Sequence, residues 1–172
     1  MKVFDLFTYF NENDLLEIRL KYLNDSVDYF VICESNYSFS GNPKPYNLEL
    51  SWERFKSFHD KIIYIKIDQD PSKFLFRNVD RYDPTNGPFQ MEHEQRSYLN
   101  AIDHMIGDDD LCLVGDLDEI PDKQTINNIK NVNDLIGSWL SEPHSVLMNF
   151  FAYYLNNLTV SGPDVKWINT IS

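Results

Sequence analysis

Short apolar runs alternate with segments of helical periodicity along most of the chain. Runs rich in β-branched and aromatic residues predict strands, and apolar residues spaced three or four positions apart predict amphipathic helices. The predicted strands are residues 2–10, 27–34, 61–67, 110–116, 144–155 and 165–172. The predicted helices are residues 11–25, 48–60, 91–107 and 122–131. This alternation predicts βαβ units, and therefore an α/β fold with a mostly parallel central sheet flanked by helices.

The strands and the helix ends allow finer predictions. Segments 27–34, 61–67 and 110–116 are apolar almost throughout, which predicts strands buried on both faces. Asn11 is a candidate N-cap of the first helix, because a short polar side chain there can accept a hydrogen bond from the first turn. Gly107 is a candidate for the residue that ends the third helix in a left-handed conformation.

Polar residues follow three of the predicted strands directly. Asn11 and Glu12 follow the first strand, Glu34 ends the second, and Asp116 and Asp118 follow the fourth. Ligands of open α/β sheets bind outside the carboxyl ends of the parallel strands. The sequence therefore predicts a binding site where these three segments converge.

The acidic run LCLVGDLDEIP carries the most specific chemistry. In extended backbone, residues two apart point the same way, so Asp116 and Asp118 would face one point while Leu117 turns to the core. Two carboxylates at one point repel each other unless a cation or a proton lies between them. Mg²⁺ or Mn²⁺ takes one or two carboxylates and completes its shell with water and phosphates. The run therefore predicts a metal–diphosphate site, and capping of the next helix is the alternative.

Two other motifs resemble this run. An EF-hand loop requires glycine at its sixth position, where this chain has Pro121, so a calcium loop is excluded. A Mg²⁺-dependent phosphatase of the haloacid dehalogenase type also uses Asp-x-Asp after a strand. Its motif usually has Thr or Val where Ile120 stands, and usually lies near the chain start. This phosphoryl-transfer alternative stays open.

Composition narrows the class of protein. The 172 residues fit one domain, and 15% aromatic residues argue against disorder. The net charge of −12, with scattered Lys and Arg, argues against nucleic-acid binding, which needs a basic patch. Cys33 and Cys112 lie in apolar runs, as buried reduced thiols do. The start has no signal-peptide pattern and no apolar run reaches membrane-spanning length, so we expect a soluble, cytoplasmic protein without a transmembrane segment.

Five successive blocks resemble glycosyltransferase family 17. They are DLFTYFNENDLLEIRL, VDYFVICESNYSFSGNPKP, KIIYIKID, EHEQRSYLNAI and DLCLVGDLDEIP. The resemblance implies a GT-A-like, Rossmann-like fold and an N-acetylglucosaminyltransferase-like activity. It also implies a UDP-sugar donor carrying GlcNAc, Mn²⁺ or Mg²⁺ as cofactor, a glycan or polysaccharide acceptor, and inversion at the anomeric carbon.

The resemblance also assigns residues. It makes Asp116 and Asp118 metal ligands, with Asp118 the first choice, and gives Asp118 and Glu119 catalytic roles. The positions that it implies for nucleotide-sugar binding are Asn11, Glu12, Glu34, Ser35, Asn36, Lys44, Gln95, Arg96 and Asp116. Structural alternatives remain for several of them: helix capping for Asn11, a side-chain turn at residues 34–36, and an ion pair between Arg96 and Glu92.

The family's catalytic domain is longer than this chain. We therefore expect one domain in which residues 1–121 bind donor and metal and residues 122–172 begin an incomplete acceptor part. Asp122, Glu142 and Asp164 are candidates for the base that deprotonates the acceptor, and their spacing selects none of them. A nucleotide-sugar-binding remnant without turnover is the non-enzymatic alternative, and no pattern indicates an oligomeric state.

Overall fold

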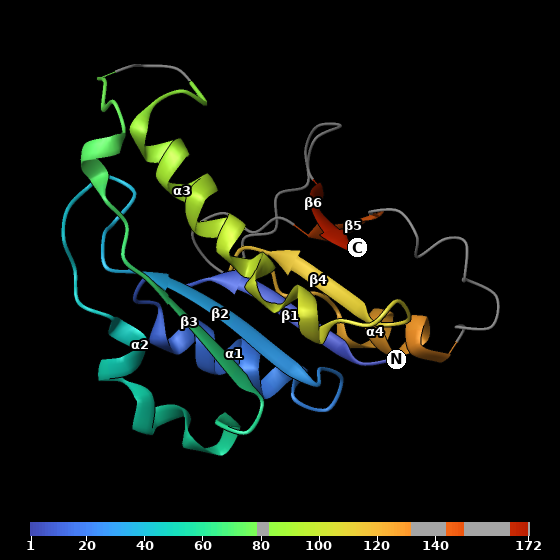
Figure 1. Cartoon of the computed structure of the whole chain (residues 1–172). Coiled ribbons are helices and arrows are strands. Elements are labelled where there is room, and N and C mark those ends of the chain that lie inside the picture. Colours follow the sequence, from blue (N-terminus) through green and yellow to red (C-terminus); the bar gives the residue numbers. More distant parts are fainter. Residues whose placement is uncertain (79–82, 132–143, 150–165, 172) are drawn as a thin grey trace.

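The computed structural model describes residues 1–78, 83–131, 144–149 and 166–171. Its strands are β1 (Val3–Thr8), β2 (Tyr29–Ser35), β3 (Ile62–Ile67), β4 (Leu111–Gly115), β5 (His144–Asn149) and β6 (Lys166–Ile171). They form one six-stranded sheet in the order β3-β2-β1-β4-β6-β5 (Figure 1). The four strands β3, β2, β1 and β4 run parallel, and β6 and β5 are added antiparallel. The predicted mostly parallel α/β sheet is confirmed; of the predicted strand 144–155, residues 150–155 lie outside the described part.

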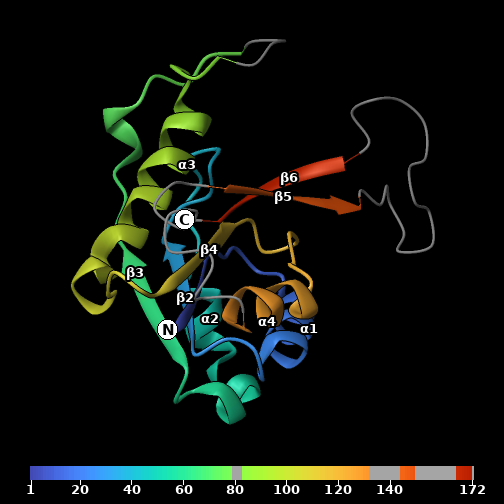
Figure 2. The ribbon, with the colours of Figure 1, turned by 90° about the vertical axis from the view of Figure 1, so that its right-hand side faces the viewer.

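Helices cover both faces of the sheet. The α-helices are α1 (Asn13–Leu23), α2 (Asn47–Leu50), α3 (Gly87–Ser97) and α4 (Lys123–Asn131). The 3₁₀ helices are η1 (Trp52–Phe58), η2 (Pro71–Lys73) and η3 (Tyr98–Met105). Figure 2 shows α3 on one side of the sheet and α1, α2 and α4 on the other.

Each face of the sheet has its own apolar core. Phe7 of β1 packs with Leu16 of α1 in the larger core, which also takes residues of η1 and α4. Phe4 of β1 points to the opposite face and packs with Leu99 and Ile102 of η3. The central strands β1 and β2 are therefore buried on both faces, as parallel strands covered by helices are.

The structure corrects three of the expected details. β3 is mostly half-buried, because it lies at the edge of the described sheet and has a strand on one side only. The predicted helix 91–107 is α3 followed by η3, and α3 starts earlier because the Asn86 side chain accepts a hydrogen bond from Gly87 N–H. Gly107 does not adopt a left-handed conformation; among the described glycines only Gly41 does, with φ 78°.

Asn11 is not the N-cap of α1. The cap position belongs to Glu12, which makes no side-chain hydrogen bond to the helix. Its carboxylate instead accepts hydrogen bonds from the N–H groups of Phe10 (3.2 Å) and Asn11 (2.9 Å). Glu12 thus occupies the cap position in place of Asn11, and its carboxylate bonds to the backbone of the preceding loop and not to the helix.

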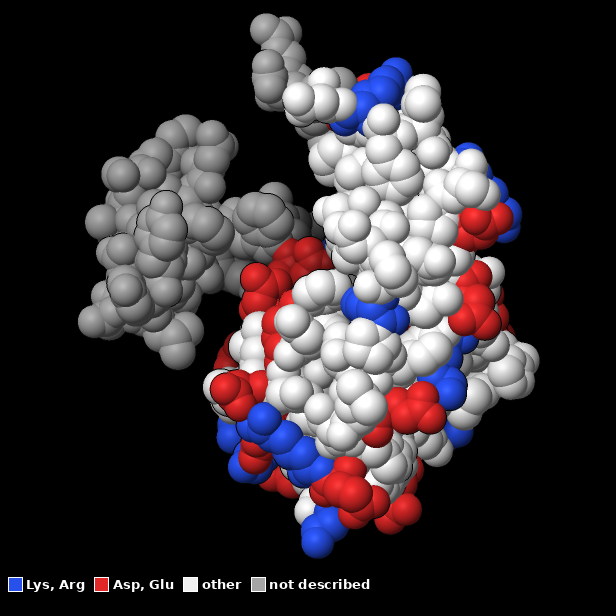
Figure 3. All heavy atoms as spheres, turned by 90° about the vertical axis from the view of Figure 1, so that its left-hand side faces the viewer, with Lys and Arg blue, Asp and Glu red and all other residues white. Residues whose placement is uncertain are grey.

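The site described next lies where the parallel strands end. The loops after β1, β2 and β4 leave from one edge of the sheet, and α3 continues past this edge (Figure 1). On the face over β3 and η1, acidic and basic side chains are interspersed, without a continuous basic patch (Figure 3). No helix in the described ranges combines the length and the apolar character needed to cross a membrane.

Candidate functional site

The acidic run forms a tight turn at the end of β4. Glu119 N–H donates to the carbonyl oxygen of Asp116 (3.0 Å), and Asp116 N–H donates to the carboxylate of Glu119 (2.8 Å). Leu117 is buried, as predicted, and Asp116 and Asp118 both line the same pocket. The common direction of the two aspartates therefore comes from a turn closed by Glu119, and not from the extended backbone that we expected.

A buried arginine, Arg19, forms hydrogen bonds to the backbone of this turn. Arg19 of α1 is fully buried, and its Nε and Nη2 donate to the Asp5 carboxylate of β1 at 2.9 and 2.7 Å. Its Nη1 donates to the carbonyl oxygens of Asp116 (2.6 Å), Leu117 (2.9 Å) and Glu119 (3.2 Å). One guanidinium therefore fixes the backbone of the acidic turn to two elements distant in sequence.

The sequence interpretation missed this pair, although a signal was present. Asp5 stands alone among the apolar residues of the first strand, and Arg19 shares the buried stripe of the first helix with Leu16 and Leu20. A buried charge must be paired, so an isolated acid in a strand and a base on the buried face of the next helix predict a partnership.

A second arginine, Arg96, contacts a side chain of the acidic turn. Arg96 of α3 donates from Nη2 to Glu92 Oε1 (3.0 Å) and forms an ion pair with Asp116 Oδ1. The expected ion pair with Glu92 is therefore present, together with a contact to the predicted metal ligand. Arg96 Nε is buried and has no hydrogen-bond partner within the described residues.

The electrostatics of the turn favour the arrival of positive charge. Burial, and then the negative charges of Asp118 and Glu92, raise the pKa of Asp116, while Arg96 and Arg19 oppose this shift. Burial also raises the pKa of Glu119, as do the charges of the two aspartates. The carboxylates therefore repel one another, and a cation bound between them would relieve that repulsion.

The pocket at the strand ends has a volume of about 620 Å³. Four aromatic side chains from the loops after β1 and β2 line it: Tyr9, Phe10, Tyr37 and Phe39. Four carboxylates also line it: Glu12, Glu92, Asp116 and Asp118. The pocket therefore offers aromatic surface to a planar ring and carboxylates to a cation.

Five of the residues predicted for ligand binding line this pocket. They are Glu12, Lys44, Gln95, Asp116 and Asp118. Gln95 is nearly buried, and its amide donates to the carbonyl oxygen of Cys33 (3.1 Å), which ties α3 to β2. Lys44 Nζ lies 5.3 Å from the centre of the Phe10 ring. Of the polar residues expected to converge at the strand ends, Glu12, Asp116 and Asp118 line one pocket, and ligand binding by them stays a prediction.

Glu34 lies beneath the pocket and does not line it. This carboxylate is fully buried and accepts hydrogen bonds from Lys44 Nζ (2.6 Å) and Tyr64 Oη (2.7 Å). It also accepts from the N–H groups of Asn47 (2.6 Å) and Leu48 (3.1 Å) at the start of α2. Both oxygens are thus occupied by donors of the fold, so the structure gives Glu34 the role of anchoring α2 and the Lys44 loop.

Five other predicted residues lie outside the pocket lining, and one of them is Arg96, whose contacts are given above. Ser35 Oγ accepts from Tyr37 N–H (3.0 Å), which is the side-chain turn given as the alternative. The Asn36 side chain donates to Asp68 (3.1 Å) and accepts from Gln69 N–H (2.9 Å), so it joins the loops after β2 and β3. Asn11 is exposed. Glu119 closes the acidic turn through its own backbone and carboxylate.

Asp122 was a candidate for the base that deprotonates the acceptor, but its carboxylate is used within the fold. Asp122 accepts hydrogen bonds from Thr125 N–H (3.0 Å) and Tyr22 Oη (3.0 Å), so it caps α4. Glu142 and Asp164, the other candidates for an acceptor base, lie outside the described residues.

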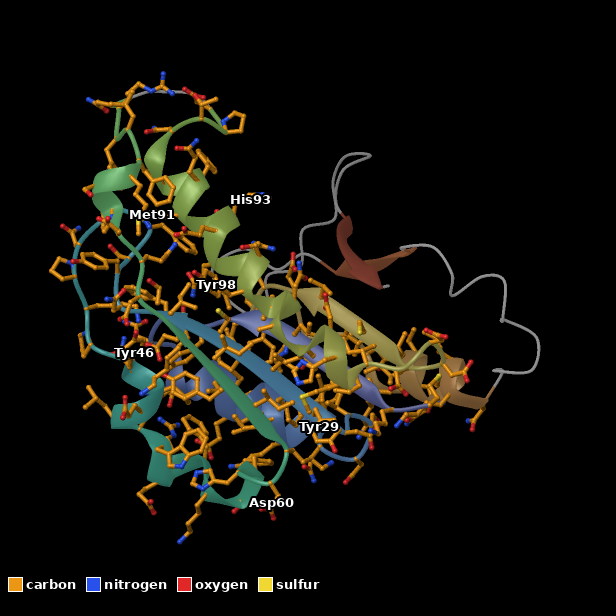
Figure 4. All side chains as sticks on the ribbon, in the orientation of Figure 1. Tyr29, Tyr46, Asp60, Met91, His93 and Tyr98 are labelled. Atoms are coloured by element: carbon orange, nitrogen blue, oxygen red, sulfur yellow. The ribbon has the colours of Figure 1, made fainter. Side chains whose placement is uncertain are left out.

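Met91 is fully buried, whereas the exposed His93 projects from the other side of α3 (Figure 4).

The donor set determines which metal fits. Within the described ranges no cluster of three or more His, Cys, Asp or Glu side chains could enclose a metal ion. Asp118 is exposed and its carboxylate makes no hydrogen bond or ion pair with described residues, while Asp116 faces the same pocket. Two carboxylates fit Mg²⁺ or Mn²⁺ that completes its octahedral shell with water and phosphate oxygens, and do not fit a closed structural site.

Comparison with known proteins identifies the family of this chain. A family model described as glycosyltransferase family 17 matches residues 1–159, which includes every pocket residue named above. The chain belongs to glycosyltransferase family 17. Within the family, this chain is similar to the β-1,4-mannosyl-glycoprotein 4-β-N-acetylglucosaminyltransferase of Homo sapiens, with 38% identity over 63 residues. The protein of the same name from Rattus norvegicus is also 38% identical, and that from Mus musculus is 36% identical.

The extent of these matches is limited. The aligned segment covers 36% of this family 17 chain and 12% of each mammalian relative. What the relatives' name says about their acceptor and their sugar is therefore a property of those proteins.

Proposed function

We propose that this chain carries the donor and metal site of an inverting glycosyltransferase that transfers GlcNAc from UDP-GlcNAc to a glycan or polysaccharide. One observation carries the proposal: Asp116 and Asp118 line the same pocket as a group of aromatic side chains, at the carboxyl ends of parallel strands. Membership of family 17 supports the reaction class. The relatives' name supports GlcNAc as the sugar.

The carboxylates of Asp118 and Asp116 hold Mn²⁺ or Mg²⁺ in this proposal. Such an ion, when bound, would supply positive charge to offset the charge that develops on the departing nucleoside diphosphate. Glu119 and Arg19 keep the two aspartates in place, since both form hydrogen bonds to the backbone of the turn.

The remaining parts of the pocket bind the organic part of the donor. Tyr37, Phe39 and Phe10 supply aromatic faces on which a uracil or a sugar ring stacks. Lys44 lines the pocket and adds positive charge there, while its ammonium group donates to the buried Glu34 and to the carbonyl oxygens of Phe10 and Pro45. Arg96 is the better partner for the diphosphate, because its planar fork matches two phosphate oxygens at once.

Thermal unfolding with added ligands tests the proposal. UDP and UDP-GlcNAc, each with and without Mn²⁺, are added to the wild-type chain and to Asp118→Asn. A ligand at a hundred times its Kd stabilises a fold by about 2.7 kcal/mol. For a chain of this size that corresponds to a rise in Tm of roughly 5–10 °C. We expect such a rise with UDP and Mn²⁺ together in the wild type, and its loss in Asp118→Asn.

Asp109→Asn is the matched control, because Asp109 is an exposed carboxylate near the other end of β4. This variant should respond to UDP and Mn²⁺ as the wild type does. If no nucleotide raises the wild-type Tm with any divalent ion, the donor site is refuted. Release of phosphate from simple esters, with an aspartyl-phosphate at Asp116 or Asp118, would instead indicate the phosphatase alternative. UDP-sugar binding without transfer or donor hydrolysis would indicate a binding remnant.

A further inference from the structure

Arg96 occupies the position of a counter-ion to a predicted metal ligand. It lies on α3 and pairs with Asp116 Oδ1, and Asp116 itself lines the pocket. A metal ion bound by Asp116 would neutralise the same carboxylate. The two cations would repel each other across this carboxylate, so binding of the metal weakens the attraction between Arg96 and Asp116.

The contacts of Arg96 with described residues involve one of its three guanidinium nitrogens, Nη2. Nη2 alone serves both Glu92 and Asp116, while Nε is buried without a partner among the described residues. Guanidinium groups bind best when two parallel N–H groups meet two oxygens, as they do on a phosphate. The side chains of Arg96 and Asp116 are 37% and 42% exposed, so neither is locked in place by packing.

Space is available for Arg96 to change partners. The side chain borders a second groove of about 750 Å³ along α3, which Phe89 and His93 also line. Glu92 lines both this groove and the acidic pocket, and it stays within reach of Arg96 from the preceding turn of the helix. Arg96 can therefore leave Asp116 without losing its pairing with Glu92.

The charge of the pocket makes this exchange consequential. Four carboxylates line the pocket, so a free nucleoside diphosphate meets repulsion until a cation enters. A free metal ion, in turn, finds Asp116 already paired with Arg96. Each ligand alone therefore meets an obstacle that the other removes.

We propose that Arg96 couples the binding of metal and diphosphate: it neutralises Asp116 in the empty site and transfers to the diphosphate when the metal takes Asp116. This inference rests on the proposed function, because it requires both ligands. It goes further in assigning to one side chain the dependence of each ligand's affinity on the other. By thermodynamic linkage the two dependences are equal.

Isothermal titration calorimetry on the intact chain tests the coupling. Three Kd values are measured: Mn²⁺ alone, UDP alone, and UDP at saturating Mn²⁺. Loss of a partly exposed ion pair corresponds to a factor of roughly 1.4–5 in affinity. In Arg96→Gln we therefore expect Mn²⁺ alone to bind about two- to fivefold more tightly than in the wild type. UDP at saturating Mn²⁺ should bind roughly 10–100-fold more weakly, because charge-assisted hydrogen bonds to the diphosphate are lost.

Two further variants sharpen the test. Arg96→Lys keeps the positive charge but loses the fork, so Mn²⁺ alone should bind as in the wild type, while UDP at saturating Mn²⁺ binds more weakly. Arg54→Gln is the matched control: Arg54 has a similar exposure of 39% and also pairs with two carboxylates, Asp14 and Glu17, but lies outside the pocket. Its three Kd values should equal those of the wild type.

The outcomes separate the coupling from the proposed function. If the wild type binds UDP with Mn²⁺ but Arg96→Gln binds Mn²⁺ alone no more tightly, or keeps wild-type affinity for UDP, the coupling role is refuted and the donor site stands. If the wild type does not bind UDP with Mn²⁺ at all, the proposed function fails, and the coupling fails with it. If Arg96→Gln does not fold, Arg96→Lys decides, because unchanged UDP affinity at saturating Mn²⁺ would refute the role of the fork.

Discussion

The buried pair of Arg19 and Asp5 gives the sharpest test of how the acidic turn is held. Arg19→Met removes the guanidinium but keeps an apolar side chain of similar length in the core. It leaves Asp5 fully buried without its partner, and it removes the donor to the carbonyl oxygens of Asp116, Leu117 and Glu119. We expect a loss of stability together with a looser metal site.

The magnitude follows from the burial of both groups. Each side chain has 0% exposure, so no water can replace the lost partner without opening the core. Removing one member of such a pair typically costs about 3–5 kcal/mol. A domain is stable by only about 5–15 kcal/mol, so Arg19→Met should lose a large fraction of its free energy of unfolding.

The double variant Asp5→Leu/Arg19→Met separates stability from positioning. Replacing a buried ion pair with apolar side chains is often close to neutral, so we expect the double variant to recover more than half of the lost stability. The turn still lacks its donors. Loss of residues that orient metal ligands typically weakens metal binding by about 10–100-fold, so Mn²⁺ with UDP should bind roughly tenfold more weakly than in the wild type.

Urea unfolding followed by circular dichroism measures the stability, and calorimetry measures the affinity for UDP at saturating Mn²⁺. Arg54→Met, which breaks an exposed ion pair also made with α1, is the control and should leave the affinity unchanged. A loss below about 1 kcal/mol in Arg19→Met would refute the buried-pair reasoning. Wild-type affinity in the double variant would show that Arg19 serves only as a partner for Asp5.

Two other predictions follow from buried groups. Glu34→Gln should lower the free energy of unfolding by about 3 kcal/mol in a urea titration, because it leaves the nearly buried Lys44 without its carboxylate. Glu49→Gln, which breaks an exposed ion pair, is the control and should cost under about 1 kcal/mol in the same titration. Burial raises the pKa of the Cys33 thiol to about 12 and that of Cys112 to about 11. Both thiols should therefore resist iodoacetamide at pH 8 in the native state and react in urea. The unfolded thiols ionise near pH 8.5 and the folded thiols only at higher pH, so the free energy of unfolding should fall as the pH rises from about 9 to 11. A urea midpoint that stays constant over that range would contradict this.

Much of the framework could be predicted without the structure. The alternation of apolar runs with helical periodicity predicted the parallel sheet, because the spacing of buried side chains follows the local geometry of strands and helices. The run from Leu111 to Glu119 predicted the acidic edge, since the carboxyl ends of parallel strands meet on one side of the sheet. Leu117 was correctly expected in the core.

Predictions about single side chains were less successful where a long-range partner determines the role. Glu34 looked like a ligand for a nucleotide because it follows a strand. In the structure its oxygens accept from Lys44, Tyr64 and the start of α2, which lie 10 to 30 positions away. Asn11 does not have its expected capping role, because α1 begins one residue later and Glu12 occupies the cap position. Neither outcome is visible in a local pattern.

The sequence by itself determined the strands, most of the helices, the acidic edge and the resemblance to family 17, because these depend on residues close together in the chain. Only the tertiary structure decided how the aspartates are held. Arg19 bonds to a turn about 100 positions away, and Arg96 pairs with an aspartate 20 positions away. These contacts exist because the fold brings α1 and α3 to the end of β4. The two aspartates that we propose as metal ligands are thus legible in the sequence, whereas the contacts by which Arg19 and Arg96 hold them are found only in three dimensions.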